Sequence, residues 1–290
     1  MSQLARVLLF PLTLLLTVGG GLWALGQGGS ETAVVAVFAG LAVGAAVLGE
    51  RFLPFRSEWR VARGDVLTDL CHGVVTNLLC PPLVKAALIL LLAPLTGSFR
   101  SIWPHGWPLV VQLVLAALVA ELGSYWGHRL AHERDELWRL HSTHHSAERL
   151  YWLNAGRDHP LGLALLFGCE ISPLIALGAS EHVLAAYALF TVVVGVFQHA
   201  NVDVRLGPLN WVFSLSELHR WHHSRNVSEA NHNYGSNLIV WDVVFGTRFL
   251  PDRPPPVDVG LANMPDFPQT YLKQLAVPFR WRTARTQPTS

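Results

Sequence analysis

The sequence predicts an all-α integral membrane protein, a helical bundle of about four transmembrane helices plus a membrane hairpin. Three observations predict this class. Hydrophobic residues make up 51% of the chain and charged residues only 14%, a balance that is unusual in soluble globular proteins. Apolar runs long enough to cross a bilayer recur along the chain. Twelve of the 14 histidines lie between His128 and His232, next to those runs.

Two apolar runs, 4–25 and 32–49, predict the first two transmembrane helices. The first run is long for the core of a signal peptide and has no clear A-x-A cleavage site, which favours a transmembrane span. The second is followed by four arginines between residues 51 and 63, whereas the loop between the runs has no basic residue. The positive-inside rule therefore predicts that the N-terminus and segment 51–63 lie in the cytoplasm.

A third apolar stretch, 66–95, contains Pro81 and Pro82, which must kink or break a helix. It predicts either one kinked helix or two short ones. Asp65, Asp69 and His72 recur at helical spacing on one face of this stretch, with Thr76 one turn further. That face looks either toward a polar site or toward solvent at the interface. Residues 96–107 suit an interfacial loop on the far side of the membrane.

The fourth span covers 108–125, and we expect His128 and His132 on its last turns at the cytoplasmic side. The arginine-rich segment that follows agrees with this placement. Two further apolar runs, 161–177 and 182–197, predict a membrane hairpin because only a short break separates them. The ends of this hairpin present His159 and His199 to the same side as the other histidines.

These features divide the chain into three parts. Residues 1–65 hold two transmembrane helices and a basic cytoplasmic loop, residues 66–250 hold the domain that carries all 14 histidines, and residues 251–290 form a proline-rich, basic tail. A net charge of +1 argues against a nucleic-acid partner, which requires a concentrated basic surface. The three cysteines show no C-x-x-C spacing and predict neither disulfides nor a thiolate metal site.

Three histidine elements carry the chemistry. They have the patterns H-x-x-x-H, H-x-x-H-H and H-x-x-H-H, and their histidines are His128, His132, His141, His144, His145, His219, His222 and His223. Histidines four apart share one helix face, so His128 and His132 can converge on one ion. The same holds for His141 with His144 or His145, and for His219 with His222 or His223. Adjacent histidines point about a third of a turn apart, so they can serve different ions. Eight imidazoles exceed one tetrahedral site, which favours two metal ions.

The identity of the metal stays open on spacing alone, since imidazole binds zinc, copper, iron and nickel. A zinc protease would need His-Glu-x-x-His, which is absent. A carboxylate-bridged di-iron bundle would need two Glu-x-x-His motifs. Only the stretch from Glu229 to His232 has that form, and His232 is a weaker candidate ligand than the histidines of the three elements.

The order of the three elements after a membrane helix resembles the fatty acid hydroxylase / sterol desaturase superfamily of integral membrane di-iron oxygenases. The resemblance covers about residues 60–250. Further matching motifs are Arg157-Asp158-His159-Pro160, Gln198-His199-Ala200-Asn201, Glu217-Leu218-His219-Arg220-Trp221-His222-His223, Asn233-Tyr234-Gly235 and Trp241-Asp242-Val243-Val244-Phe245-Gly246-Thr247. It implies that the iron ligands are His128, His132, His141, His144, His145, His159, His199, His219, His222 and His223.

The resemblance also implies that residues 66–250 are the catalytic domain and that they hold two iron ions (a di-iron centre), with dioxygen as co-substrate. The topology predicted above puts this centre at the cytoplasmic face of a membrane, where a lipid substrate reaches it from the bilayer. No haem, flavin or dinucleotide fingerprint is present, so electrons come from a separate cytochrome, ferredoxin or reductase. The expected reaction is hydroxylation of a fatty acyl, sterol or related C–H bond; desaturation and ether-lipid cleavage are alternatives. A membrane zinc hydrolase or a non-redox metal-binding protein is the alternative outside this class.

Two further expectations concern the surroundings of the site. Acidic side chains at Asp158, Glu217 and Asp242 are candidates to accept hydrogen bonds from ligand imidazoles and so orient them. The scarcity of lysine, with only Lys85 and Lys273 among the 21 basic residues, hints at a bacterial source. For such a source the expected location is the inner membrane.

Overall fold

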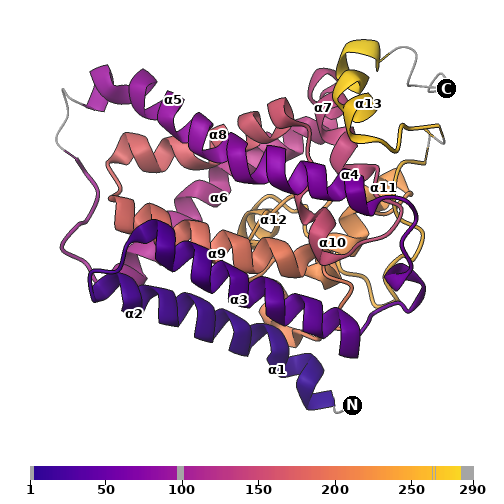
Figure 1. Cartoon of the computed structure of the whole chain (residues 1–290), viewed down its shortest axis with the longest axis horizontal. Coiled ribbons are helices and arrows are strands. Elements are labelled where there is room, and N and C mark those ends of the chain that lie inside the picture. Colours follow the sequence, from indigo (N-terminus) through magenta and orange to yellow (C-terminus); the bar gives the residue numbers. More distant parts are fainter. Residues whose placement is uncertain (1–2, 97–100, 263, 265, 282–290) are drawn as a thin grey trace.

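The computed structural model describes residues 3–96, 101–262, 264 and 266–281. Within them the elements are helical, and β-structure is limited to three isolated bridges. The long helices lie along the longest axis of the molecule, and α1 begins at the same end of the bundle at which α13 lies (Figure 1). Part of the predicted loop 96–107 and the last nine residues of the predicted tail lie outside the described residues.

Six helical segments of the described chain are long and apolar enough to cross a membrane, which confirms the predicted spans and hairpin. They are Gln3–Gly26 (α1 Gln3–Leu14, η1 Leu15–Gly19, α2 Gly20–Gly26), α3 Glu31–Phe52, Val66–Ala93, α6 Leu109–Glu133, α8 Pro160–Leu177 and α9 Glu181–His199. Gly178 ends α8 in the left-handed conformation with φ of 83°, which favours glycine and turns the chain into α9.

The third span resolves the question that Pro81 and Pro82 leave open. The chain runs through α4 Val66–Cys71, the π-helix η3 His72–Leu79 and α5 Cys80–Thr96 without leaving a helical conformation. A π-helix is wider than an α-helix and is one of the recognised ways in which a helix bends. It directly precedes the prolines, whose rings would clash with the preceding turn of a regular α-helix. The stretch is therefore one continuous helical segment.

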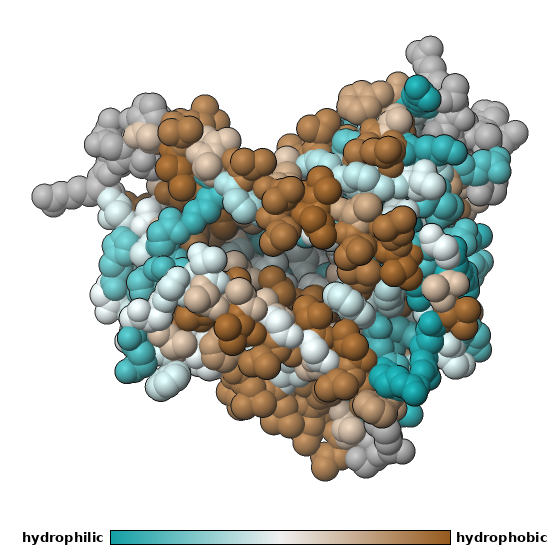
Figure 2. Space-filling model, viewed as in Figure 1, coloured by the Kyte–Doolittle hydropathy of each residue, from teal (hydrophilic) through white to brown (hydrophobic). Residues whose placement is uncertain are grey.

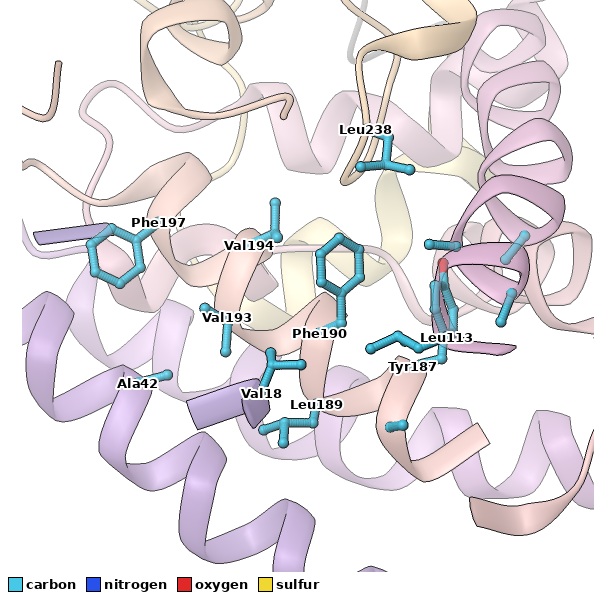
Figure 3. Packing of buried hydrophobic residues seen from close by; sticks show 14 of the residues in the cluster. Val18, Ala42, Leu113, Tyr187, Leu189, Phe190, Val193, Val194, Phe197 and Leu238 are labelled. Atoms are coloured by element: carbon cyan, nitrogen blue, oxygen red, sulfur yellow. The ribbon is translucent and has the colours of Figure 1, made fainter. Parts of the chain in front are cut away.

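Helix α9 lies at the centre of the bundle and is the most buried of the spans. Figure 3 shows Val193, Leu189 and Phe197 of α9 facing the N-terminal helices, which contribute Val18 and Ala42. Small residues let neighbouring helices approach closely, as membrane packing favours. At Gly123 of α6, a Cβ atom would lie 2.1 Å from the Cys169 carbonyl oxygen of α8, so only glycine permits this contact.

The outer surface of the helices is apolar. Leu83, Leu90 and Leu91 of α5 are each at least 70% exposed, and hydrophobic side chains cover the middle of the molecule, while hydrophilic ones gather toward the two ends of its long axis (Figure 2). Such a belt fits the hydrocarbon region of a bilayer. The same face is hollowed between α5 and α9 (Figure 2), where the apolar surface is interrupted.

Short elements form a cap where α3, α6 and α9 end. They are η2 Glu58–Arg60, α7 Asp135–His145, η4 Trp152–Gly156, η5 Gly207–Trp211, α10 Ser216–His222, α11 Val227–Ala230, α12 Val240–Val244, α13 Tyr271–Ala276 and η6 Val277–Arg280. The end of α3 reaches the end of α9, since the Phe55 backbone N–H donates to the Asn201 carbonyl. The cap therefore rests on the ends of three spans.

Candidate metal centre

Four helices deliver the histidines to one place. His128 and His132 lie on the last turns of α6, as predicted, and His199 is the last residue of α9. Helix α7 carries the second histidine element on its last two turns. Helix α10 carries the third, with its final histidine, His223, directly after the helix end. All of these positions lie where a membrane span meets the cap.

The imidazoles form two groups, in each of which one nitrogen per residue lies within 4.8 Å of the others. The five-histidine group contains His128, His132, His141, His145 and His222. The four-histidine group contains His144, His199, His219 and His223. Each adjacent pair is divided between the groups, because neighbouring side chains on a helix point about 100° apart.

The five-histidine group has unpaired nitrogens in its interior. Nε2 of His132, His145 and His222 is buried and has no hydrogen-bond partner in the protein. A buried polar atom without a partner costs about 1–3 kcal/mol. Three such atoms in one group of imidazoles therefore fit a bound metal ion, which would accept their lone pairs.

The four-histidine group converges through Nε2 as well. Nε2 of His199 lies 2.9 Å from Nε2 of His219 and 3.3 Å from Nε2 of His144. The other ring nitrogen of His199, Nδ1, contacts Oδ1 of Asn154 at 3.0 Å. When Nδ1 donates this hydrogen bond, Nε2 of a neutral imidazole keeps its lone pair for a metal.

One loop, residues 232–237, orients two imidazoles of the five-histidine group. Nδ1 of His128 donates to the Tyr234 carbonyl at 2.7 Å, and Nδ1 of His222 donates to the His232 carbonyl at 2.8 Å. The fully buried carboxylate of Asp242 accepts from the backbone N–H groups of Tyr234 and Gly235, both at 2.8 Å. These bonds fix which nitrogen of each imidazole faces the group.

The same loop is tied to the membrane helices. Glu121 of α6 accepts hydrogen bonds from the backbone N–H groups of Ser236 and Asn237. Asn233 adopts the left-handed conformation with φ of 56°, and its side chain donates to the Leu218 carbonyl at 3.0 Å. The loop is thereby fastened both to a span and to α10.

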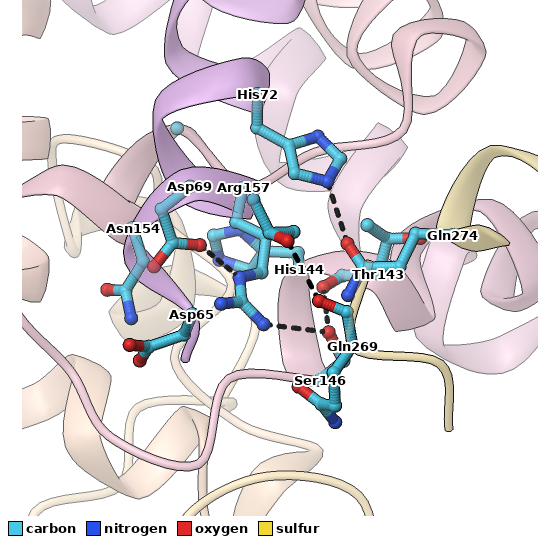
Figure 4. A network of polar contacts seen from close by, with 12 residues as sticks. Asp65, Asp69, His72, Thr143, His144, Ser146, Asn154, Arg157, Gln269 and Gln274 are labelled. Carbon is cyan, nitrogen blue, oxygen red and sulfur yellow. Dashed lines mark hydrogen bonds and ion pairs between the residues drawn. The ribbon is translucent and has the colours of Figure 1, made fainter. Parts of the chain in front are cut away.

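Buried ion pairs support the four-histidine group from the side of α4. Asp69 accepts from Nε of Arg157 at 2.5 Å and from the Tyr151 hydroxyl at 2.6 Å. Figure 4 shows Arg157 lying between Asp69 and Ser146, close to His144. Asp65, Asp69, His72 and Thr76 are all buried, so the polar face of the third span looks toward the site and not toward solvent.

The cap histidines are held in the form that binds metals. Burial lowers the pKa of His144 to about 4, and the nearby Arg157 charge acts in the same direction. Burial also lowers the pKa of the remaining cap members, His141, His145, His219, His222 and His223, well below the usual range. Metals bind the neutral form of imidazole, so these histidines do not have to release a proton before they bind a metal near neutral pH.

His159 joins neither group. Its Nδ1 accepts a hydrogen bond from the Leu161 N–H at 3.2 Å, which caps α8, and its Nε2 contacts the Leu275 carbonyl at 3.2 Å. Both ring nitrogens are therefore engaged by the backbone. His232 also lies outside both groups, with its ring packed on Phe249 at a centroid distance of 4.9 Å.

The three predicted acidic acceptors have different positions. Asp158 places a carboxylate oxygen 3.6 Å from Nδ1 of His144, and burial raises the pKa of this carboxyl to about 7. Asp242 acts on His128 only through the Tyr234 backbone. Glu217 accepts from the Leu206 N–H and from Asn210, so the expectation that it orients an imidazole is wrong.

Sequence reasoning missed the acceptors that orient the imidazoles. They are the carbonyls of His232 and Tyr234 and the side chains of Asn154 and Asn231. A backbone carbonyl has no residue signature, because every residue carries one. The one sequence signal for this loop was the Asn233-Tyr234-Gly235 motif, to which the spacing of the histidine elements assigned no role.

The class is a multi-pass membrane protein built around a histidine-rich site suited to metal ions, because six apolar helices form the bundle and two groups of convergent imidazoles lie where α6 and α9 end. The chain belongs to the fatty acid hydroxylase family, whose model matches residues 113–247. It is an enzyme of this family, as the resemblance of its histidine elements predicted.

Several relatives carry names that state an activity. Ornithine lipid hydroxylase OlsE of Rhizobium tropici is 37% identical over 256 residues, which are 86% of this chain and 73% of the relative. Human alkylglycerol monooxygenase is 33% identical over 189 residues, 63% of this chain and 40% of the relative. A very-long-chain aldehyde decarbonylase of Oryza sativa is 29% identical over 50% of this chain and 54% of the relative. No solved structure gives a significant match.

Proposed function

We propose that this enzyme is a di-iron, dioxygen-dependent hydroxylase of a membrane lipid. The observation that carries the proposal is the pair of histidine groups at the ends of apolar spans. Among the relatives named above, the ornithine lipid hydroxylase matches the largest share of this chain, and this similarity supports a lipid substrate. We further propose that residues 66–250 form the catalytic domain between the N-terminal helices (1–65) and the tail (251–290).

The residues present fit two iron ions. The five-histidine group would hold one ion and the four-histidine group the other, so the proposed ligand set omits His159. Iron bound there would supply the redox chemistry by which one lipid C–H, one dioxygen, two electrons and two protons become an alcohol and water. The electrons come from a separate donor of the cytochrome, ferredoxin or reductase type, because the chain carries no fingerprint of a redox cofactor.

The protein's own contribution is to orient the imidazoles and to keep water away. Carbonyl acceptors of the 232–237 loop fix the tautomers of His128 and His222, and the histidines themselves are nearly all buried. A preorganised, dry site lets charged and reactive species be held without rearrangement of solvent. Asp158, beside His144, is the acidic group placed to hold or release a proton there.

Lipid access from the bilayer is supported by the hollow between α5 and α9 (Figure 2). Gly195 lies one helical turn before His199 on the same face of α9. A Cβ atom at Gly195 would meet nothing within 4 Å, so the space next to this face is open. We propose that an acyl chain passes α9 here on its way to the four-histidine group.

The site is proposed to face the cytoplasm of a bacterial inner membrane. Helices α3, α6 and α9 end at the cap, and the segments that follow α3 and α6 are rich in arginine. The positive-inside rule places such segments in the cytoplasm. The similarity to a Rhizobium enzyme supports a bacterial membrane.

The function is tested by metal analysis and turnover of protein purified from cells supplied with iron. We expect about two irons per chain, as the two groups imply, and a lipid product that forms only with dioxygen and an electron donor. Stoichiometric zinc together with dioxygen-independent turnover would instead establish a hydrolase. His144→Ala should lower iron content and abolish activity while membrane insertion is retained; full activity would refute the ligand assignment.

A separate pair of variants tests the access route. Gly195→Leu fills the open space beside α9 and should lower turnover of long-chain lipids by at least about 10-fold, the effect of about 1.4 kcal/mol, without loss of iron. Gly40→Leu is the matched control, because Gly40 also has open space around it but lies exposed on α3. Equal activity of the two variants would exclude this route.

Ether-lipid cleavage is the second candidate reaction, and the similarity to alkylglycerol monooxygenases favours it over desaturation. Hydroxylation at the carbon next to an ether oxygen gives a product that breaks down to an aldehyde and an alcohol. Analysis of the product by mass spectrometry separates the outcomes. A stable added oxygen indicates hydroxylation, and a released aldehyde indicates ether cleavage.

A further inference from the structure

One part of the cap extends along the side of α6 toward the middle of the bundle. It consists of residues 236–245, which contain α12 and are here called the inserted segment. The indole Nε1 of Trp241 donates to the Leu118 carbonyl of α6 at 3.1 Å. Leu118 lies ten residues before His128 on α6, a distance of about 15 Å along a helix. The inserted segment therefore reaches well into the length of a membrane span.

A second span gives a similar depth. Leu238 of the inserted segment belongs to the buried apolar cluster that includes Phe190 of α9 (Figure 3). Phe190 lies nine residues before His199, the last residue of α9, which is about 13 Å along the helix. The side-chain Nδ2 of Asn237 lies 3.4 Å from the hydroxyl of Tyr187, which is further still from the end of α9. Two spans thus place the inserted segment at membrane depth.

The inserted segment lies on the outer face of α6. Val111 and Val114 of this helix are exposed, and Trp126 is exposed again near its end. Leu118 lies four residues after Val114 and shares its face of the helix. It is only partly exposed, and Trp241 binds its carbonyl there. The inserted segment is therefore at the apolar surface of the bundle and not in its centre.

The backbone of the inserted segment suits a hydrocarbon environment. Hydrocarbon offers no hydrogen-bond partners, so irregular backbone is tolerated at membrane depth where protein surrounds it. Asn237 and Ile239, which are not helical, are both fully buried. The Asn237 N–H donates to Glu121 at 2.9 Å, and the Ile239 N–H donates to the Val212 carbonyl at 3.0 Å. The irregular part of the segment is therefore paired inside the protein.

The exposed part of the inserted segment is apolar. Val243, Val244 and Phe245 are 40%, 64% and 38% exposed, and the N–H groups of Val243 and Phe245 donate to backbone carbonyls of the segment at 3.0 and 2.8 Å. The Phe245 ring lies 5.1 Å from the rings of Tyr125 and Trp126, measured between centroids. Aromatic rings near the end of a span are typical of the membrane interface. The segment therefore returns from the depth of Leu118 to the interface at Phe245.

We propose that the inserted segment is a re-entrant membrane element, and that Val243, Val244 and Phe245 contact the acyl chains of the lipid leaflet next to the cap. It is additional to the six spans, and it enters and leaves the membrane on one side because α11 and α13 of the cap precede and follow it. The proposal does not depend on the hydroxylase function. Its consequence for the site is that the bilayer anchors the loop that orients His128 and His222.

The first experiment uses the wild-type, full-length protein in nanodiscs that contain phosphatidylcholine with a photoreactive diazirine in its acyl chain. We expect acyl adducts on residues 240–245 and on the exposed residues Leu90 and Leu91 of α5, located by peptide mass spectrometry. Val257, an exposed residue of the cap, should carry none. Adducts on α5 without adducts on residues 240–245 would overturn the proposal.

The second experiment measures access of water to the same place. The variants Val244→Cys, Val257→Cys and Leu90→Cys put a thiol at exposed positions, and each is treated in nanodiscs with a membrane-impermeant maleimide. Peptide mass spectrometry reads every cysteine separately, so the native cysteines stay in place. A thiol reacts as its thiolate, which forms poorly in apolar surroundings. We expect Val244→Cys to react at least about 10-fold more slowly than Val257→Cys, the effect of one pKa unit, and at about the rate of Leu90→Cys.

The two experiments together distinguish the bilayer from other surroundings of α12. Slow maleimide labelling together with acyl adducts supports the re-entrant element. Labelling of Val244→Cys at the rate of Val257→Cys would show that water covers α12, and slow labelling without acyl adducts would show that protein, such as a second copy of this chain, covers it. Either result overturns the proposal. Iron and turnover enter neither measurement, so the hydroxylase function is tested separately.

A charge at the same position gives a third, independent result. Val244→Asp should lower the unfolding temperature in nanodiscs by at least about 2 °C, because a charged side chain is costly in hydrocarbon. Val257→Asp is the matched control and should leave the unfolding temperature unchanged, since substitutions on a surface that faces water usually have little effect. A wild-type unfolding temperature in Val244→Asp would contradict the contact with acyl chains.

Discussion

Replacing Asp242 with alanine removes the acceptor that holds the loop orienting two candidate ligands. The Asp242 carboxylate accepts from the N–H groups of Tyr234 and Gly235 and from the Thr247 hydroxyl at 2.7 Å. The carbonyl of Tyr234 in turn accepts from Nδ1 of His128. The variant therefore acts on the metal site through the loop backbone, although Asp242 itself touches no histidine of either group.

The structure sets the size of the effect. Two backbone N–H groups lose their acceptor inside the protein, and each buried donor without a partner costs about 1–3 kcal/mol. Asp242→Ala should therefore lower the free energy of unfolding by about 2–6 kcal/mol. Loss of an outer partner of a ligating histidine typically lowers metal affinity about 10–100-fold. Asp242→Asn keeps one oxygen acceptor and should lie between wild type and alanine.

Two quantities are measured. The first is iron per chain, by mass spectrometry after dialysis against a weak chelator, and the second is the unfolding temperature in detergent. Asp252→Ala is the control, because Asp252 is exposed on the cap and should change neither quantity. Wild-type iron retention in Asp242→Ala, together with an unchanged unfolding temperature, would show that the loop does not position the ligands.

Three further predictions follow from the site and the topology. The variant His159→Ala should keep the wild-type iron content, and its free energy of unfolding should fall by about 1 kcal/mol because the N-terminal cap of α8 is lost. Loss of one iron would show that His159 is a ligand. Iron-free protein should lose stability, measured as the unfolding temperature, as the pH falls from about 6.5 to about 4, because histidines of the unfolded chain take up protons in this range whereas buried His144 does so only near its pKa of about 4. The carboxyls of Asp158 and Asp242 have raised pKa values and act in the opposite direction, but they are fewer than the six cap histidines. A stability that rises over this pH range would contradict the burial of these histidines. Reporter fusions after Gly28 and after Arg56 should report opposite sides of the membrane, since α3 lies between them; the same side for both would remove α3 as a span.

The periodicity of the sequence was sufficient to anticipate how each histidine element is used. The 100° step between neighbours predicted that His144 and His145 could serve different ions, and the structure divides them between the two groups. Spacing left open which of the two would share an ion with His141. These are properties of a single helix and need no knowledge of the fold. The apolar runs were equally informative, because the length needed to cross a bilayer is fixed by its thickness.

The prolines of the third span show a limit of local patterns. Pro81 and Pro82 predict a disturbance of the helix, but the choice between a break and a bend depends on whether the preceding turn widens.

His159 shows a second limit of local patterns. Its motif matches the family pattern, yet its ring caps α8 and meets the C-terminal segment, with a contact to residue 275 that no spacing rule contains.

The sequence by itself determined the membrane bundle, the helices that carry the histidines and the face of each helix on which they lie, because these follow from local periodicity and apolar length. Only the tertiary structure decided which histidines share a group and which carbonyl orients His128 across 106 residues of chain. The physical reason is that packing brings these groups together from distant parts of the chain, and every residue type can supply a carbonyl.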